Sequence, residues 1–336
     1  MTASPEVSAA TGADSPLRWP LRLGLFVVAG GSIAALLADV FGIAPMWIVF
    51  WGASIPAMLL LAILGTSARV HPELRARIRV GAFAGVIGTF GYDIVRIPFA
   101  LAGQRVFAPI ESYGVLIANA SASSGLTSTL GWAYHVSNGV TFGIAYAAVA
   151  ARRPWPWGIV WGLTLESVAV FSPFAARYGL QGQLVPIMIA YGAHVFYGYP
   201  VGRLVQDLDR VGAALRRAGR FSVAVVLVIT SVGIVGWHRP WSQSEVERDA
   251  AQASSGGVPH TIVSGFRFEP EWLRVRTGGC VVVDNRTNTS YETPQGTVGA
   301  NASSTLCFDQ PGIYRIRLGS RPYSGGFVYV DAVGGG

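Results

Sequence analysis

Two copies of one pattern, H-V-x-x-G-x-x-x-G, lie inside long apolar segments of this sequence. The first copy begins at His135 and the second at His194. A histidine in a hydrocarbon environment is rare and usually faces the inside of a helix bundle or a cavity. Glycines four residues apart on a helix let another backbone, or a flat ligand, come close. The pattern therefore predicts two tightly packed helices that turn a histidine inward. The expected packing glycines are Gly139, Gly143, Gly198 and Gly202.

The composition places most of the chain in a lipid bilayer. Of the 336 residues, 51% are hydrophobic and 13% are charged, whereas soluble domains carry about 25% charged residues. Every basic residue is arginine, which is typical of a GC-rich bacterial genome, and the net charge is +7. These arginines lie in short connections between apolar segments, as the positive-inside rule requires, so we expect no nucleic acid partner.

Apolar runs of roughly 20 residues, the length needed to span a bilayer, number about seven. They are residues 22–41, 45–65, 79–101, 127–151, 156–175, 184–205 and 221–237. Arginines are concentrated in every second connection, which places those connections in the cytoplasm. An odd number of spans puts the N-terminus inside and the C-terminal part outside. We therefore expect a multi-pass α-helical bundle in the inner membrane of a bacterial cell.

Composition also divides the chain into parts. Residues 1–20 form a disordered cytoplasmic tail, 21–237 the helical domain, 238–258 a polar linker, and 259–332 an extracytoplasmic β-rich domain. The connection at 102–126 is partly apolar. We expect it to be a surface loop, with a re-entrant or interfacial segment as the alternative.

The helical domain contains a longer repeat around the two histidine patterns. In the first copy a G-x-x-x-G motif begins at Gly81 and precedes Asp93, and in the second it begins at Gly158 and precedes Glu166. Each motif is followed by the helix that carries the histidine pattern. The order predicts a parallel two-helix repeat about an axis along the membrane normal, with coincidence in a glycine-rich sequence as the alternative. The two copies are residues 79–151 and 156–205.

Four polar side chains on four predicted helices fall at one depth, roughly 12–15 Å from the outer helix ends at about 1.5 Å per residue. They are Asp93, His135, Glu166 and His194. An unpaired charge at such a depth is costly, so these groups must meet one another, a metal, a cofactor or water. The side chains expected to balance or orient them are Arg96, Asn138, Tyr197 and Tyr191.

Several functions stay open for this cluster. In the first, the four side chains bind a transition metal that the protein holds or transports, because imidazole and carboxylate suit Zn, Fe, Mn or Cu. In the second, His135 and His194 are axial ligands of a b-type haem in an electron-transfer protein, with Arg96 at a propionate. In the third, the cluster is a structural network or proton path, and the protein is a scaffold whose outer domain docks a partner. No nucleophile elbow, Walker A or dinucleotide motif is present, so enzyme activity is not favoured and no catalytic residue is assigned.

The C-terminal part consists of short alternating segments broken by Gly, Pro and Asn, which is typical of a small β-sandwich. The expected strands are residues 261–266, 272–276, 280–284, 304–308, 312–317 and 326–330. The two cysteines of the chain, Cys280 and Cys307, lie here without a CxxC spacing. A single disulfide in an oxidising compartment is expected, with two buried free thiols as the alternative.

Three motifs in this part carry a family resemblance. They are F-x-F-x-P from Phe266, F-x-x-P-G-x-Y from Phe308, and G-x-V-x-V from Gly326. In order and spacing, residues 260–331 resemble the cupredoxin (plastocyanin-like) superfamily. The resemblance implies type-1 copper ligands of His, Cys, His and Met. The corresponding positions here hold Tyr291, Leu318, Arg321 and Ser324. Because a type-1 centre needs a thiolate, and Cys307 lies on another strand, we expect no copper in this domain. It is expected to cap the membrane site or to bind a partner.

Overall fold

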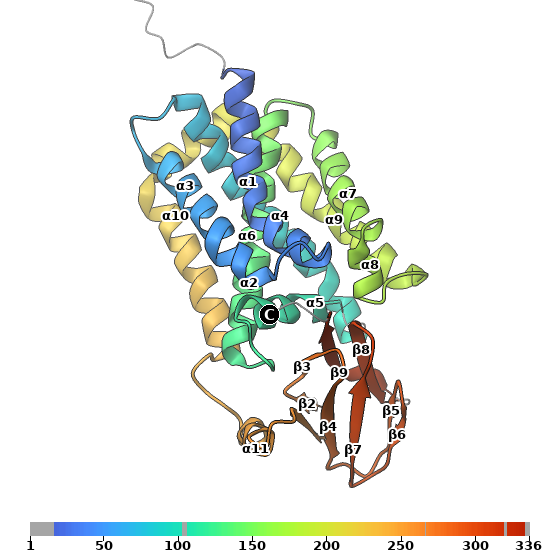
Figure 1. The fold of residues 1–336 in the computed structure, drawn as a ribbon. Helices are drawn as coiled ribbons and strands as arrows, with labels where there is room; N and C mark the ends of the chain where they lie inside the picture. The colour runs from blue at the N-terminus through green and yellow to red at the C-terminus, as the bar shows by residue number, and fades with distance from the viewer. Residues whose placement is uncertain (1–16, 103–105, 266, 319–320, 333–336) are drawn as a thin grey trace, which may run out of the picture.

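The computed structural model describes residues 17–102, 106–265, 267–318 and 321–332, apart from the side chains of 220–227, 318 and 321–324. A helical domain and a C-terminal β-domain lie end to end (Figure 1). The predicted tail at 1–20 lies outside the description up to residue 16, and the first helix already begins at Trp19. The prediction of an apolar helical domain followed by a β-rich domain is confirmed.

The helical domain is built from ten α-helices and one π-helical turn within the described ranges, and one more helix follows it. They are α1 Trp19–Val40, α2 Met46–Val49, η1 Phe50–Ser54, α3 Ile55–Thr66, α4 Pro72–Leu101, α5 Ala108–Ile117, α6 Gly125–Ala150, α7 Pro156–Val170, α8 Pro173–Arg177, α9 Leu184–Gln206, α10 Leu208–His238 and α11 Glu245–Ser254.

Local sequence signals account for many of the helix ends. Proline occupies the first turn of α1, α3, α4, α5, α7 and α8, where its missing N–H has no intrahelical acceptor to lose. At the start of α6, the backbone N–H of Thr127 donates to the Ser124 hydroxyl and the N–H of Ser124 donates to the Thr127 hydroxyl. Gly219 takes non-helical dihedral angles (φ 75°, ψ 176°) inside α10, so α10 consists of two segments joined by a kink.

Four helices are long and apolar enough to cross a membrane: Trp19–Val40, Met46–Thr66, Pro72–Leu101 and Leu184–Gln206. The predicted count of seven is not confirmed. The reason differs between the other three candidates. Helix α6 carries hydroxyl, amide and imidazole side chains along its length, and α7 ends after 15 residues. In the described part of α10 the apolar stretch is only Val228–His238.

Backbone contacts between glycines hold the helices together in two antiparallel pairs, α4 with α6 and α7 with α9. A Cβ atom added at Gly81 would lie 2.7 Å from the Cα of Ile144, and one added at Gly198 would lie 2.7 Å from the Cα of Ile159. Only glycine allows so close an approach. The contact glycines of the two pairs are Gly81, Gly85, Gly139 and Gly143 in one, and Gly158, Gly162, Gly198 and Gly202 in the other. The two copies of the sequence repeat therefore make the same kind of helix contact.

Helices α4 and α9 bring the two pairs together. A Cβ atom at Gly88 of α4 would meet the ring of Tyr197 and the side chain of Val201, both on α9, at 2.8–2.9 Å. The Tyr197 hydroxyl donates to the carbonyl oxygen of Gly139 on α6, at 2.8 Å. A single side chain of the second pair thus reaches across α4 to the backbone of the first pair.

The expectation of a surface loop at 102–126 is wrong. Its described part contains α5, whose residues Ser112–Ile117 are all buried. The backbone of α5 lies against α6, because Gly114 and Gly131 leave no space for a side chain between them. Most apolar residues of α5 are therefore buried inside the protein instead of facing water or lipid.

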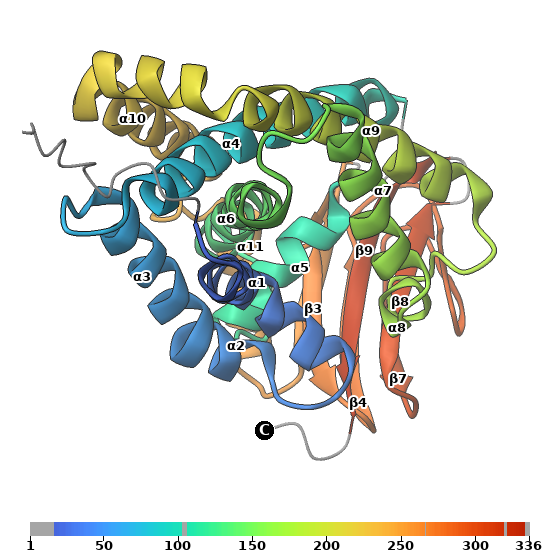
Figure 2. The same cartoon turned by 90° about the horizontal axis from the view of Figure 1, so that it is seen from above.

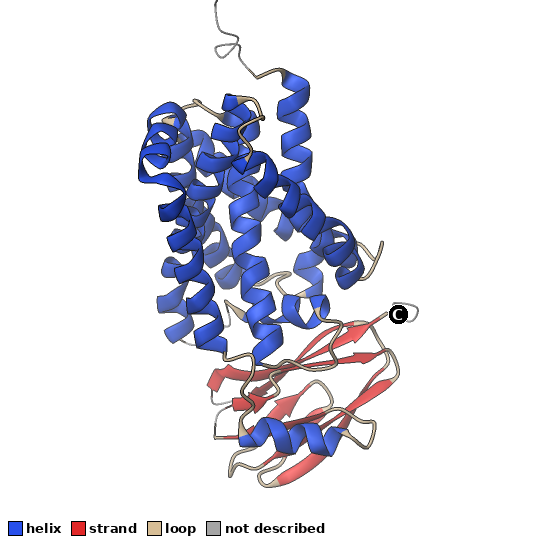
Figure 3. Cartoon of the chain, turned by 90° about the vertical axis from the view of Figure 1, so that its left-hand side faces the viewer, coloured by secondary structure: helices blue, strands red, loops and turns tan. Residues whose placement is uncertain are grey.

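The β-domain is a sandwich of two sheets with strand orders β2-β1-β4-β7 and β3-β9-β8-β5-β6. Its strands are β1 His260–Ser264, β2 Arg267–Glu269, β3 Trp272–Arg276, β4 Gly279–Asn285, β5 Tyr291–Thr293, β6 Gly296–Val298, β7 Ala302–Phe308, β8 Gly312–Leu318 and β9 Arg321–Asp331. All six predicted strands are present within the described residues, and Phe266, the last residue of the first predicted strand, lies outside them. Cys280 and Cys307 lie directly opposite each other on β4 and β7 and form the predicted disulfide. The expected linker at 238–258 is not wholly irregular, because it contains α11, which packs on β1 (Figure 3).

The β-domain is attached to the helices through an apolar interface. On β9, Val328 and Val330 face the core of the sandwich, whereas Phe327 and Tyr329 belong to a core cluster shared with α1 and α5. On β3, Trp272 joins that shared cluster and stacks on Phe327 with 4.5 Å between ring centroids. Both faces of β9 are therefore buried, one by each domain.

Backbone pairing adds to this interface. The segment before α6 runs along β3: the N–H of Ser123 donates to the carbonyl of Trp272 at 2.8 Å, and the N–H of Arg274 donates to the carbonyl of Ser121 at 2.7 Å. Asp39, at the end of α1, accepts from the Tyr329 hydroxyl at 3.2 Å and pairs with Arg177 of α8 at 2.8 Å. These contacts fix the β-domain against the helices.

We expect Gly81→Ala and Gly198→Ala to destabilise the protein, because each new methyl group must push two helix backbones apart. Gly192→Ala on α9 and Gly24→Ala on α1 are matched controls, since a Cβ atom at either position meets nothing within 4 Å. The controls should be neutral or should raise stability slightly, by about 1 kcal/mol or less from better helix propensity. Thermal unfolding in detergent measures the difference, and equal melting temperatures for all four variants would contradict the glycine contacts.

Candidate functional site

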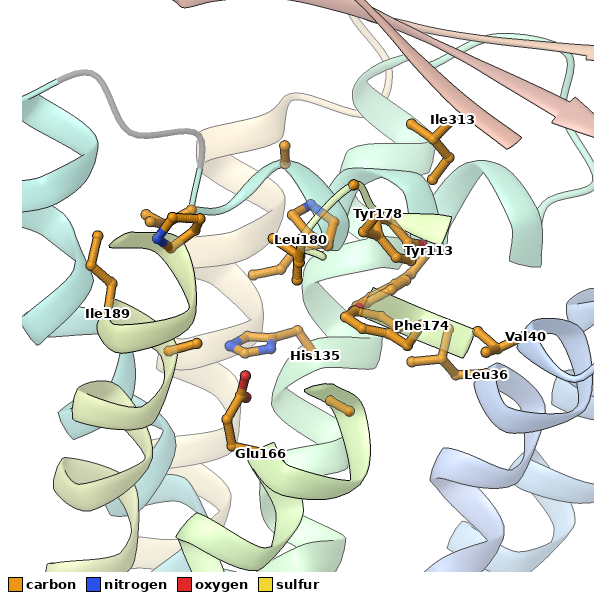
Figure 4. Close-up of a pocket in the computed structure, with 18 of the residues that line it drawn as sticks. Leu36, Val40, Tyr113, His135, Glu166, Phe174, Tyr178, Leu180, Ile189 and Ile313 are labelled. Atoms are coloured by element: carbon orange, nitrogen blue, oxygen red, sulfur yellow. The ribbon is translucent and has the colours of Figure 1, made fainter. Parts of the chain in front are cut away.

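A cavity of about 750 Å³ lies between the two helix pairs and extends to the β-domain. Its walls come from α1, α4, α6, α7 and α9, with α5 and α8 near the β-domain. Most of the lining is aliphatic or aromatic, and Figure 4 shows Leu36, Val40, Phe174, Leu180 and Ile189 around it. Small-molecule sites in proteins have volumes of roughly 300–1,000 Å³, so the cavity has the size of a ligand site.

The first polar pair in the cavity wall joins α4 and α6. His135 Nε2 lies 3.0 Å from Asp93 Oδ1 and 3.1 Å from Oδ2. Arg96, one turn further along α4, places Nη1 3.6 Å from Asp93 Oδ1. The carboxylate therefore has a cationic partner on its own helix and an imidazole partner on the next helix.

The second polar pair joins α7 and α9. His194 Nδ1 lies 3.1 Å from Glu166 Oε2 and 3.0 Å from the carbonyl oxygen of Ala190. Glu166 is buried, with 6% of its surface exposed. Each copy of the repeat thus supplies one acid from its first helix and one histidine from its second, and the two copies form the same kind of pair.

The ring of Tyr92 connects the two pairs. Its centroid lies 5.8 Å from the imidazole of His135 and 4.8 Å from that of His194. In Figure 4 the carboxylate of Glu166 and the imidazole of His135 point toward one another in the cavity. The two pairs therefore form one polar floor, in which an acid of the second pair faces the histidine of the first.

Arg96 is held in place by aromatic rings. Its guanidinium carbon lies 4.6 Å from the ring centroid of Tyr92 and 4.5 Å from that of Phe107. Such cation–π contacts stabilise a charge in a site with little water. The guanidinium balances the charge of Asp93, so the first pair tolerates burial without any bound cation.

The hydrogen bonds define which imidazole nitrogen carries a proton. His135 Nε2 faces two carboxylate oxygens, and His194 Nδ1 faces a carboxylate and a carbonyl oxygen. Both of these nitrogens must donate, because their neighbours only accept. In the neutral imidazoles the other nitrogens, Nδ1 of His135 and Nε2 of His194, are then the basic ones. Acid–histidine pairs of this kind can take up and release a proton.

Three residues were expected to orient the histidines, and two of them have other partners. Tyr197 donates to the Gly139 carbonyl, and Tyr191 shares a hydrogen bond of 3.0 Å with Ser167. Asn138 lines the cavity and is 7% exposed, and its Oδ1 has no hydrogen-bond partner among the residues with described side chains. The expected contacts from these side chains to the histidines are therefore absent from this part of the structure.

The four residues predicted as metal ligands do not gather into one cluster in the described part of the chain. Within the described ranges, no three His, Cys, Asp or Glu side chains come close enough together to hold a metal ion. The ring of Tyr92 lies against both imidazoles. The four predicted ligands thus meet as two pairs and not as one coordination sphere.

The β-domain forms the outer wall of the cavity, which we call the roof. Roof residues include Trp272, Glu292, Pro294, Ile313, Arg317 and Phe327. Sequence reasoning suggested a cap but assigned no residues to it. One signal was available: the run Phe327-Val-Tyr-Val330 is apolar on both faces of its strand, which indicates that both faces are covered.

Comparison with known proteins finds similarity over part of the chain. Three solved structures of amicyanin variants, one oxidised and two reduced, share 18–19% sequence identity with this chain at TM-scores of 0.20–0.21. They cover 22–24% of this chain and 83–90% of the amicyanin chain. No protein-family model and no curated protein matches.

The expected copper-ligand positions can be placed only in part. Tyr291 is fully buried in the sandwich core, and its ring packs edge-on against Phe268 with 5.2 Å between centroids. The side chains of Leu318, Arg321 and Ser324 lie outside the described part of the structure. Tyr291 therefore has the position of a packing residue within the sandwich.

The two histidines should differ in tautomer, and ¹⁵N NMR of protein labelled at histidine can test this. We expect a proton on Nε2 of His135 and on Nδ1 of His194, because those nitrogens face acceptors. Asp93→Leu should remove the preference of His135 for a proton on Nε2. Glu166→Leu should leave His194 unchanged, since the Ala190 carbonyl still accepts from Nδ1. Finding one common tautomer for both histidines would contradict the hydrogen-bond network.

Proposed function

We propose that this chain is a membrane protein that binds a small lipid-soluble molecule with a hydrogen-bonding end, and exchanges a proton with that end. The observation that supports this most is the combination of one apolar cavity with two acid–histidine pairs in its floor. The apolar walls suit the body of such a ligand. The basic imidazole nitrogens and the unpartnered Oδ1 of Asn138 suit a hydroxyl or amine donor.

A proton path would explain why the two acid–histidine pairs lie inside the helical domain, which a purely structural network would not require. Ionisable groups inside membrane domains are expensive, and they commonly mark proton relays or substrate paths. Here both acids already have partners, and the second imidazole nitrogen is left for another group. A ligand hydroxyl bound at His135 could pass its proton to Nδ1, while Asp93 stabilises the imidazolium that results.

The topology we propose has seven spans, with α6, α7 and the second segment of α10 added to the four apolar helices. The arginine-rich end then lies in the cytoplasm and the β-domain outside. A disulfide between Cys280 and Cys307 agrees with an oxidising compartment. In this orientation the cavity lies in the outer half of the membrane under the roof. The β-domain would act as a cap without copper, because the type-1 ligand positions are replaced.

A matched pair of probes tests the binding of a polar end. 4-Hexylphenol and 4-hexylanisole share one apolar body, but only the phenol has a donor. We expect the phenol to bind at least about tenfold more tightly, since a hydrogen bond to a well-placed acceptor contributes about 1.5 kcal/mol. Isothermal titration calorimetry in detergent measures both affinities. Repeating it in buffers of different ionisation enthalpy counts the protons exchanged.

The control for this experiment is a histidine outside the cavity. His135→Phe/His194→Phe should lose most of the preference for the phenol, keeping only what Asn138 contributes, and should exchange no proton. His260→Phe, in the β-domain, should behave as the wild type. Similar melting curves for the variants ensure that the comparison concerns binding. Equal affinities of the two probes for the wild type would exclude a site that selects a hydrogen-bonding end.

A transition metal as cargo is the second candidate function. Each pair offers an imidazole nitrogen and a carboxylate oxygen within 3.1 Å of one another, and this is a donor set that divalent metals accept. It ranks second because no three ligating side chains converge within the described ranges. A transported ion would need water or other ligands to complete its coordination.

Elemental analysis of purified wild-type protein, beside His135→Ala/His194→Ala, separates the two candidates. We expect no stoichiometric metal in either protein, because two ligands per pair hold an ion weakly. A metal present in a one-to-one ratio in the wild type and absent from the double variant would favour the metal function instead. An absorption spectrum of the same samples tests for haem.

A further inference from the structure

A second, smaller hollow lies at the arginine-rich end of the helical domain, away from the cavity under the roof. It has a volume of about 250 Å³. Its lining residues come from the start of α4 and the first segment of α10: Pro72, Arg75, Ala76, Arg79, Gly212 and Arg216. Among these there is no carboxylate. Three guanidinium groups therefore surround one small space.

Backbone carbonyls at the end of α3 hold two of these arginines. Arg75 Nη1 donates to the carbonyl oxygen of Ser67 at 3.2 Å, and Arg79 Nε donates to that of Gly65 at 2.7 Å. Arg75 and Arg79 lie one turn apart on α4, so their side chains lie on the same face of the helix. Arg216 is exposed and comes from the other side, since α10 runs beside α4 (Figure 2).

The acids nearest to the hollow are engaged by another arginine. Arg152 donates to Asp209 through Nε and Nη2 at 3.0 and 2.9 Å, and to Glu73 through Nη1 at 3.1 Å. The hydrogen bonds from Arg152 are the main reason why the pKa of Asp209 is lowered. The side-chain hydrogen bonds of these carboxylates go to other arginines, while the charge of Arg216 also acts on Asp209 and helps to lower its pKa. The positive charge at the hollow is therefore offset only in part.

The hollow lies where a membrane helix ends. Gly65 and Ser67 are at the end of the apolar span Met46–Thr66, and Pro72 begins the next span. The first segment of α10 carries exposed arginines before the kink at Gly219. An arginine-bearing segment of this kind, next to the ends of spanning helices, is typical of the membrane–water boundary. Lipid phosphates lie at this level.

From these contacts we propose that the hollow between α4 and α10 binds the phosphate of an anionic membrane lipid. Guanidinium groups match phosphate oxygens in charge and in hydrogen-bond geometry, and basic pockets between membrane helices are suited to lipid head groups. The acyl chains would then lie along the apolar surface of α3, where Leu59, Leu60 and Ile63 are exposed. The proposal depends on the chain being embedded in a membrane, but not on which ligand the cavity takes.

Lipid retention by the full-length protein, measured by native mass spectrometry and by thermal unfolding in detergent, tests the proposal. The probes are phosphatidylglycerol, phosphatidylcholine, and glycerol 1-phosphate as the soluble phosphate. We expect phosphatidylglycerol to be retained and to raise the melting temperature. Arg75→Gln/Arg79→Gln/Arg216→Gln should lower its retention at least about tenfold, since each arginine near an anionic lipid contributes about 1 kcal/mol.

A second triple variant is the matched control. Arg203→Gln/Arg210→Gln/Arg217→Gln removes the same charge from exposed positions at the same end of the domain but leaves the hollow intact. It should retain phosphatidylglycerol within about twofold of the wild type. An equal loss in both triple variants would mean general attraction to a basic surface and would overturn the proposal.

Two further outcomes keep the test decisive. If the first triple variant does not fold, Arg216→Gln alone still removes one phosphate contact while the bonds of Arg75 and Arg79 to α3 remain. It should weaken retention about fivefold, and unchanged retention would overturn the proposal. Stabilisation by glycerol 1-phosphate equal to that by phosphatidylglycerol would assign the hollow to a soluble phosphate and not to a lipid.

Discussion

Close contact between glycine backbones is the interaction on which this structure depends. It fixes α4 against α6 and α7 against α9 in the same antiparallel manner. Beyond these contacts, in the direction of the β-domain, the helices carry Asp93, His135, Glu166 and His194, and the space between them opens into the cavity. The glycine contacts within each helix pair therefore fix the distance between its two helices, and with it the distance between the acid and the histidine that these helices carry. A membrane protein has little hydrophobic driving force between its helices, so such packing must supply it.

The β-domain closes the end of the cavity that the helices leave open. Because β9 is buried on both faces, the sandwich cannot be removed without exposing aromatic residues on each side. The pairing of residues 121–123 with β3 adds a contact that does not depend on side-chain packing. The roof is thus a fixed part of the cavity wall. The β-domain therefore bounds the cavity on one side.

Charge is distributed between the two ends of the helical domain in different ways. Around the cavity, each acid is paired with a histidine, and Arg96 adds a positive charge beside Asp93. At the arginine-rich end, cations exceed acids and the surplus surrounds a hollow at the membrane boundary. The first arrangement suits proton exchange with a neutral ligand, and the second suits an anion.

The sequence by itself indicated most of the apolar helices, the six main strands and the two cysteines that pair, although α4 and α10 begin well before the predicted spans and α5 and α11 were not predicted. It also singled out the four polar residues of the two acid–histidine pairs. These follow from apolar periodicity, turn residues and the rise per residue, which are local properties. Only the tertiary structure decided how the four polar residues pair, namely Asp93 with His135 and Glu166 with His194. It also decided that Tyr92 lies against both histidines. Asn138 and Tyr191, by contrast, do not contact the histidines. The tertiary structure also decided that residues 108–117 form a buried helix and that Phe327 belongs to an interface. The reason is that these contacts depend on how each helix is rotated about its axis and on which strand face meets another domain, and spacing along the chain fixes neither.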